Sequence, residues 1–267
     1  MPKQKPVTEP FPIFSVGNRF LLYDVNVVSH VRAKYHVCGT LSGTLPQIPQ
    51  QNLFLGLPLE LMVEEAALLV EKGAAYVVND VATHKTSLES MSGPDRTAFL
   101  ARRLASSEAE AVARHERNFQ SRKAFAEANN LPEPTPTEPD METRYHHIKT
   151  NSEAPYYSLK NSPDALKPSP DPAAFAIYTH LQEKGYFLSP GLRFGCQFMA
   201  YPGDPLRFHS HFLVTGLKWD EDIDILDIVT GGRLGTGVKK AWMFGGKQGT
   251  EKEDGESRVF SVEWGGF

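Results

Sequence analysis

Residues 186–212, YFLSPGLRFGCQFMAYPGDPLRFHSHF, contain the pattern that decides the fold of the C-terminal part of the chain. The aromatic and β-branched content of RFGCQFMAY, and of HSHFLVTGLKW further on, is typical of β-strands. Between them, Pro-Gly-Asp-Pro predicts a turn that folds the chain back on itself. A residue before such a turn can lie close to one after it, so Tyr201 and His209 could flank a common point. The alternative is that Tyr201 is a packing residue, as is common for a tyrosine ahead of a proline turn.

A helix is predicted before this stretch and further elements after it. Asp171 is suited to cap the N-terminus of the helix, Pro172 to its first position and Gly185 to its end. After the stretch, residues 223–246 predict a short helix, a glycine-rich turn and a strand, and RVFSVEWGGF predicts a last strand with alternate residues on one face. A helix and several strands with one inserted helix predict a compact α/β domain of about a hundred residues.

The beginning of the chain predicts a small mixed α/β domain over residues 1–90. RFLLYD is strand-like, VNVVSHVRAKYHV is helix-like, and AAYVVND is typical of a buried strand. Within LPLELMVEEAALLVEKG, Pro58 is suited to the first position of a helix that ends before Gly73.

Two segments separate this domain from the C-terminal domain, residues 171–267. Residues 91–130 predict a long, mostly solvated helix rich in Ala, Glu and Arg. Its arginines could form a nucleic-acid face, but pairing with glutamates one turn away is the more economical interpretation. Residues 131–170 are rich in proline, which favours an extended linker.

The composition excludes several classes of protein. The chain has 267 residues, a formal net charge of −4 and two cysteines, so neither a disulfide framework nor a cysteine metal site is expected. The apolar runs are too short to span a bilayer, and the start of the chain lacks the apolar core of a secretory signal. A free-standing nucleic-acid binder would usually be basic, so any nucleic acid must meet local positive charge or charge supplied by a partner.

Histidine and lysine are the candidate chemical groups. His209 and His211 are two residues apart and would share one face of a strand, but no third local ligand for a metal is present. The segment TGGRLGTGVKK departs from both phosphate-loop patterns. Of Lys239 and Lys240, only one can face a shared cleft if both lie in a strand.

The acidic run DEDIDILD, residues 220–227, allows a second hypothesis. Carboxylates ahead of a lysine could hold a divalent metal, as in restriction-type nucleases. The alternative, which we favour, is an acidic loop followed by the N-terminus of a short helix, where carboxylates suit the helix dipole.

Taken together, YPGDPLRFH, GRLGT and the lysine after them resemble the tRNA-splicing endonuclease family, and within it the eukaryotic catalytic subunit 34 type, over about residues 172–267. The resemblance implies a restriction-endonuclease-like domain with a central mixed β-sheet. It implies a metal-independent catalytic triad formed by Tyr201, His209 and Lys240, with no cofactor. All three residues are present, so nothing in these motifs marks the chain as a non-catalytic member that only scaffolds the complex.

In this family the 2′-hydroxyl of the RNA attacks the adjacent phosphate and leaves a 2′,3′-cyclic phosphate and a 5′-hydroxyl. The resemblance implies that His209 protonates the leaving oxygen, that Lys240 stabilises the charged intermediate, and that Tyr201 acts as the general base or orients the 2′-hydroxyl. It further implies cleavage of intron-containing pre-tRNA at the 3′ splice site.

The resemblance also implies an intracellular heterotetramer, in the nucleus or alternatively in the cytoplasm or at the outer mitochondrial surface. Its other members would be a small structural subunit, a second catalytic subunit and a larger structural subunit. The closing strand is either the edge that pairs with the small subunit or an internal strand of the domain's own sheet. Both positions are compatible with its sequence.

Overall fold

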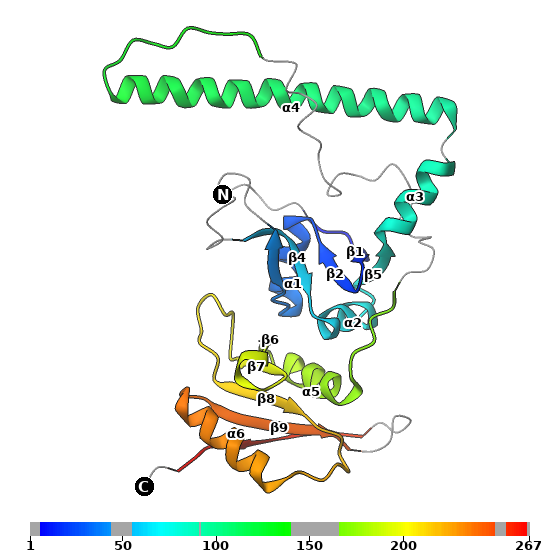
Figure 1. Cartoon of the computed structure of the whole chain (residues 1–267), viewed down its shortest axis with the longest axis vertical. Helices are drawn as coiled ribbons and strands as arrows, with labels where there is room; N and C mark the ends of the chain where they lie inside the picture. The colour runs from blue at the N-terminus through cyan, green and yellow to red at the C-terminus, as the bar shows by residue number, and fades with distance from the viewer. Residues whose placement is uncertain (1–5, 44–54, 91, 140–165, 249–254, 266–267) are drawn as a thin grey trace. The chain divides into compact units, whose positions relative to one another are not determined.

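The structure, a computed structural model, describes residues 6–43, 55–90, 92–139, 166–248 and 255–265. Within these residues, two five-stranded sheets form in the compact unit made of residues 1–83 and 159–267 (Figure 1). The strand orders are β3-β4-β2-β1-β5 and β10-β9-β8-β7-β6. Each sheet is mixed, because β1 runs parallel to β5 and β8 runs parallel to β9. The predicted α/β class is therefore confirmed.

The first sheet belongs to the N-terminal domain, and two helices cover one of its faces. Its elements are β1 (Phe11–Val16), β2 (Arg19–Leu22), α1 (Val25–Tyr35), β3 (Thr40–Gly43), β4 (Gly56–Leu61), α2 (Val63–Glu71) and β5 (Ala75–Asn79). Apolar side chains of α1 and α2 pack with those of four of the strands into one core. Asp24 begins α1 by accepting a hydrogen bond from the backbone N–H of Asn26. The strand and helix predicted over residues 19–37 are confirmed.

The predicted helix start at Pro58 is wrong. Pro58 lies in β4, which pairs with β2 and β3, and the alternation of buried Leu59 and Leu61 around Glu60 has the period of a strand. The helix begins only after Met62, whose backbone N–H is bound by the carboxylate of Glu65 at 2.8 Å.

Glu65 is fully buried and also accepts hydrogen bonds from the backbone N–H groups of Cys38 and Gly39. Burial raises its pKa to about 7, although these backbone hydrogen bonds act in the opposite direction. Its carboxyl group thus joins the start of α2 to the segment that follows α1.

The second compact unit, residues 84–158, contains the long helix α4 (Gly93–Ala128), which follows α3 (Asp80–Ser90). Ser92 caps α4, and Arg117 forms an ion pair with Glu110 on its exposed surface. Residues 131–139 and 166–170 contain neither helix nor strand, and the remainder of the proline-rich segment lies outside the described residues. In the described part of the chain, no helix has both the length and the apolar character needed to cross a membrane.

The second sheet belongs to the C-terminal domain and has one helix on each face. The elements are α5 (Pro172–Glu183), β6 (Phe187–Pro190), the 3₁₀ turn Leu192–Phe194, β7 (Phe198–Tyr201), β8 (Phe212–Gly216), α6 (Ile225–Gly237), β9 (Ala241–Lys247) and β10 (Ser257–Val262). α5 and α6 contribute to separate cores on the two faces. Asp171 caps α5 through the backbone N–H groups of Ala173 and Ala174, as predicted.

The glycine-rich segment is part of a helix rather than the predicted turn. Glycine lowers helix propensity, but here it allows α6 to lie directly on β9. A Cβ atom on Gly231 would lie 2.4 Å from the indole ring of Trp242, and one on Gly235 would lie 2.6 Å from the carbonyl oxygen of Lys240. Tertiary packing therefore outweighs the local preference.

Substitution of Gly231 by alanine is expected to destabilise the full chain by about 1–3 kcal/mol, because Trp242 must move from its packed position. Gly237→Ala is the matched control, since among the described residues no atom outside its own stretch of α6 lies within 4 Å of the position that its added methyl group would take. We expect this control to be neutral or slightly stabilising. Denaturant unfolding of both variants measures the difference, and equal stability of Gly231→Ala and the unaltered chain would contradict the packing argument.

Candidate active site

Three neighbouring strands bring the predicted catalytic segments to one end of the second sheet. Tyr201 is the last residue of β7, and Lys240 immediately precedes β9. Between them, the backbone N–H of His211 donates to the oxygen of Ala200 at 2.9 Å, and the N–H of Ala241 donates to the oxygen of His211 at 3.0 Å. The backbone at His211 is thus hydrogen-bonded to both flanking segments.

The two histidines do not share a strand face, because β8 begins only at Phe212. They lie at the end of the loop of residues 202–211, which joins β7 to β8. The side chains of His209 and His211 are exposed, whereas Ser210 between them is buried. His209 is therefore presented from the loop, next to a buried residue.

The loop is folded around Asp204. The carboxylate of Asp204 accepts a hydrogen bond from the N–H of Leu206 at 2.8 Å. Its backbone oxygen accepts from the N–H groups of Arg207 and Phe208, at 2.8 and 3.0 Å. These local hydrogen bonds make a compact turn that ends directly before His209.

Tyr201 is half-buried, and its hydroxyl oxygen lies 3.3 Å from the hydroxyl of Ser189 on β6. β6 and β7 are antiparallel neighbours, and Ser189 pairs with Met199, two residues before Tyr201. Ser189 donates this hydrogen bond and the oxygen of Tyr201 accepts it. Sequence reasoning missed Ser189, because the pairing of β6 with β7 becomes visible only in the folded sheet.

The structure distinguishes the two candidate lysines. Lys239 has φ +55°, a left-handed conformation that is uncommon for residues other than glycine, and its side chain is exposed. Lys240 follows in a half-buried position, and its N–H donates to the oxygen of Gly235 at 2.8 Å. Lys240 is therefore held against the end of α6, while Lys239 extends into solvent.

The acidic run supplies a helix cap rather than a cluster of metal ligands. Asp224 caps α6 by accepting from the N–H of Leu226, and Glu221 accepts from the N–H of Lys218. Among the residues that the structure describes, no three His, Cys, Asp or Glu side chains are grouped so that they could hold a metal ion. This is the loop-and-helix arrangement favoured from the sequence.

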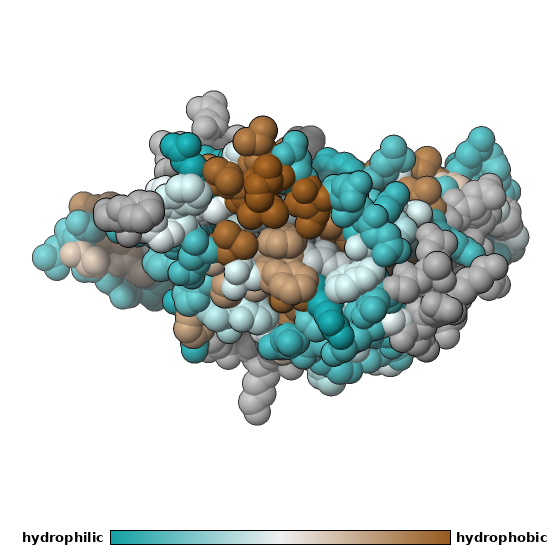
Figure 2. Space-filling view, turned by 90° about the horizontal axis from the view of Figure 1, so that it is seen from below, coloured by the Kyte–Doolittle hydropathy of each residue, from teal (hydrophilic) through white to brown (hydrophobic). Residues whose placement is uncertain are grey.

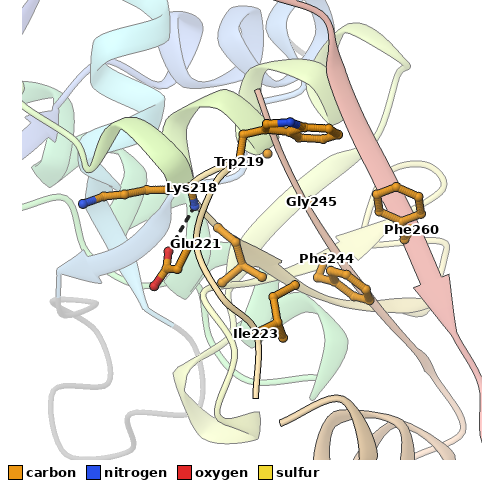
Figure 3. A pocket seen from close by; sticks show the side chains of 9 residues that line it. Lys218, Trp219, Glu221, Ile223, Phe244, Gly245 and Phe260 are labelled. Carbon is orange, nitrogen blue, oxygen red and sulfur yellow. Dashed lines mark hydrogen bonds between the residues drawn. The ribbon is translucent and has the colours of Figure 1, made fainter. Parts of the chain in front are cut away.

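A separate pocket of about 130 Å³ is shown in Figure 3. It lies at the end of the second sheet that is opposite to Lys240 and His211. Leu217 and Gly246, at the carboxyl ends of β8 and β9, line it together with Trp219, Phe244 and Phe260. Because β8 and β9 are parallel, both of their amino ends are at the other end of the sheet. His211 and Lys240 lie there. The pocket is therefore distinct from the candidate active site.

Comparison with known proteins identifies the class of this domain. Residues 173–254 match the family described as tRNA intron endonuclease, catalytic C-terminal domain. Residues 11–80 match the family described as TSEN34-like, N-terminal domain. The chain is thus an endonuclease. Its first sheet lies within residues 11–80, and strands β6 to β9 of the second sheet lie within residues 173–254.

Relatives that match over nearly their full length show which type of endonuclease subunit the chain resembles. The chain is 38% identical to the probable tRNA-splicing endonuclease subunit sen34 of Schizosaccharomyces pombe, over 97% of this chain and 99% of that protein. It is 30% identical to the subunit SEN34 of Saccharomyces cerevisiae, over 92% and 98% of the two chains. The human subunit Sen34 is 28% identical over 94% and 98%. The chain belongs to the Sen34 family of tRNA-splicing endonuclease subunits, which confirms the resemblance in its sequence.

Proposed function

We propose that this chain cuts intron-containing pre-tRNA at the 3′ splice site by metal-independent transesterification. The 2′-hydroxyl oxygen attacks the adjacent phosphorus, the bond to the 5′-oxygen breaks, and the products carry a 2′,3′-cyclic phosphate and a 5′-hydroxyl. The observation that supports this most is the meeting of three segments, with Tyr201, His209 and Lys240, at one end of β7, β8 and β9.

His209 is the general acid in this proposal. Its side chain is exposed to an incoming substrate. Before it, Phe208 is hydrogen-bonded to Asp204. After it, His211 is hydrogen-bonded to Ala200 of β7 and Ala241 of β9. An exposed imidazole on a fixed backbone can reach the 5′-oxygen and give it a proton as the bond breaks.

Lys240 acts on the reacting phosphate in this proposal, and Tyr201 acts on the 2′-hydroxyl that attacks it. The ammonium group of Lys240 stabilises the additional negative charge of the five-coordinate phosphorus intermediate. Tyr201 receives the 2′-hydroxyl proton or orients that hydroxyl, and the hydrogen bond to Ser189 keeps its oxygen in one position.

The surface proposed to bind a partner subunit consists of β10, at one edge of the second sheet, and the exposed side of α6. Within the described residues β10 pairs only with β9, so β10 is an edge strand and not an internal one. Phe260 on β10 is 52% exposed, and α6 carries the exposed Ile225, Leu226 and Leu234. Hydrophobic residues also gather on the face drawn in Figure 2, which looks from below at the side where Figure 1 shows α6.

An open strand edge with neighbouring apolar side chains is suited to pairing with another chain. We assign this edge to the small structural subunit of a nuclear heterotetramer that also contains a second catalytic subunit and a larger structural subunit. Partners would then supply part of the positive charge that a chain of net charge −4 lacks for RNA binding.

The test is cleavage of an intron-containing pre-tRNA by the reconstituted complex in excess EDTA. We expect cutting at the 3′ splice site to continue, with 2′,3′-cyclic phosphate and 5′-hydroxyl ends identified by end-specific labelling. A pre-tRNA with a 2′-deoxy nucleotide at the 3′ splice site is the control, because it lacks the nucleophile. Loss of cutting in EDTA would instead support a metal-dependent nuclease, and cutting of the deoxy substrate would contradict attack by the 2′-hydroxyl.

A further inference from the structure

We propose that Arg32, in α1 of the N-terminal domain, positions the loop that carries His209 by binding Asp204, and so sets the rate of the proton transfer by His209. This role rests on the proposed function of His209. Arg32 is a positioning residue, since it acts through Asp204 and the loop and not on the RNA.

The contact between Arg32 and Asp204 is a bidentate ion pair between residues that lie far apart in the sequence. Nε of Arg32 donates to Oδ2 at 2.9 Å, and Nη2 donates to Oδ1 at 2.6 Å. The side chains are 27% and 33% exposed. Two parallel hydrogen bonds from a planar guanidinium fix direction as well as distance, which a single charge contact does not.

The ion pair is also present throughout the neutral pH range. The hydrogen bonds from Arg32 are the main cause that lowers the pKa of Asp204 to about 2. Asp204 is therefore ionised, and the ion pair with Arg32 intact, throughout the neutral pH range.

Asp204 is joined to His209 by a short folded segment, so the ion pair with Arg32 also restricts the position of His209. It binds the N–H groups of three of the four residues that follow it, up to Phe208. The Phe208 ring packs over Gly203, where a Cβ atom would lie 2.7 Å from the ring. The segment from Gly203 to Phe208 is thus internally fixed, and His209 is the next residue.

The other end of the loop is held independently of Arg32. Ser210 is buried, and the N–H of His211 binds the oxygen of Ala200 in β7. His209 therefore lies between two fixed points, the hydrogen bond of His211 to Ala200 in β7 on one side and Asp204 on the other. Loss of the ion pair with Arg32 would release Asp204, while the hydrogen bond of His211 to β7 would remain.

Arg32 is itself on a fixed support. One turn after it, the oxygen of Tyr35 accepts a buried hydrogen bond of 2.9 Å from Gln182 of α5. Val37 then forms an isolated parallel bridge with Leu188 of β6. These contacts attach the end of α1 to the C-terminal domain, so the guanidinium group is held relative to the sheet that carries the active site.

The experiment measures single-turnover cleavage at the 3′ splice site by the reconstituted complex with Arg32→Gln, at saturating enzyme. We expect a rate about 10-fold lower, with pre-tRNA affinity unchanged, because a small displacement of a catalytic group lowers the rate more than it lowers binding. Arg19→Gln is the matched control, since Arg19 forms a similar bidentate pair with Glu60 within the first sheet, away from the loop. Complex assembly and the melting temperature are recorded for both variants.

A second substrate separates positioning of the acid from a general structural effect. Sulfur in place of the 5′-oxygen at the 3′ splice site gives a leaving group that needs no proton, since a thiol is far more acidic than an alcohol. With this substrate, Arg32→Gln and His209→Ala are both expected to cleave within about 2-fold of the unaltered complex. The double variant Arg32→Gln with Asp204→Asn should be no slower on the natural substrate than the slower single variant.

The possible results are distinct. An unaltered rate in Arg32→Gln, an equal loss on both substrates, or additive effects in the double variant would each overturn the positioning role. If His209→Ala cuts the natural substrate normally, the proposed function itself fails, whatever Arg32→Gln does. If His209→Ala is slow and Arg32→Gln is normal, only the role of Arg32 fails.

Discussion

Replacement of His209 by alanine is expected to slow cleavage at the 3′ splice site by about 10²- to 10⁴-fold, the usual contribution of a positioned general acid. Cleavage at the 5′ splice site should continue, because we assign it to the second catalytic subunit. Both products can be measured in one reaction on the same pre-tRNA, so that the 5′ cut reports the integrity of the complex.

His211→Ala is the matched control for this prediction. His211 is also an exposed histidine of the same loop, and its replacement leaves the backbone hydrogen bonds to Ala200 and Ala241 in place. We expect it to cut at close to the normal rate, because surface substitutions have small effects on stability. If His211→Ala were the inactive variant and His209→Ala the active one, the general acid would have to be reassigned.

Replacement of Lys240 by methionine is the second large effect, with an expected loss of about 10²- to 10³-fold in the rate at saturating substrate. The reason is that a positive charge aimed at the reacting phosphate stabilises the transition state more than it stabilises the bound substrate. Single-turnover rates at the 3′ site, together with binding of the pre-tRNA, separate these two contributions.

Lys239→Met removes the same charge from the adjacent position and so controls for the overall electrostatic attraction of RNA. Lys239 is exposed with a left-handed backbone, whereas Lys240 is half-buried against the end of α6. We expect Lys239→Met to alter binding slightly and the catalytic rate very little. Equal rate losses in the two variants would show that neither lysine acts on the phosphate in particular.

The local signals in the sequence predicted those elements whose ends are set by nearby residues. Asp171 and Pro172 begin α5, and the helix ends before Gly185, because caps act within a single turn. The strands around the Pro-Gly-Asp-Pro turn are predicted by their aromatic and β-branched content and by the turn between them, although β8 starts later than its apolar pattern suggests.

The errors occurred where distant residues decide the local structure. Gly231 and Gly235 favour a turn by their local preference. They lie in a helix because the ring of Trp242 approaches Gly231 closely and the carbonyl oxygen of Lys240 approaches Gly235. Pro58 is compatible with a helix start and with a strand, and the pairing of β4 with two neighbours decides between them.

In the candidate site, motif resemblance could name Tyr201, His209 and Lys240, but not the residues that support them. Ser189 and Arg32 carry no local signal. Their importance comes from contacts made by the folded sheet and by α1.

The parallel pairing of β8 with β9 determines which changes of chain length the candidate active site can tolerate. The ladder aligns Phe212 with Ala241, and the acidic loop and α6 connect the two strands outside it. Insertions or deletions in the acidic loop would change the number of residues between His209 and Lys240 while the ladder, and so the meeting of their segments, stays the same. Relatives that differ in this spacing can therefore keep a working site, and competence is better judged from the strand alignment than from residue counts.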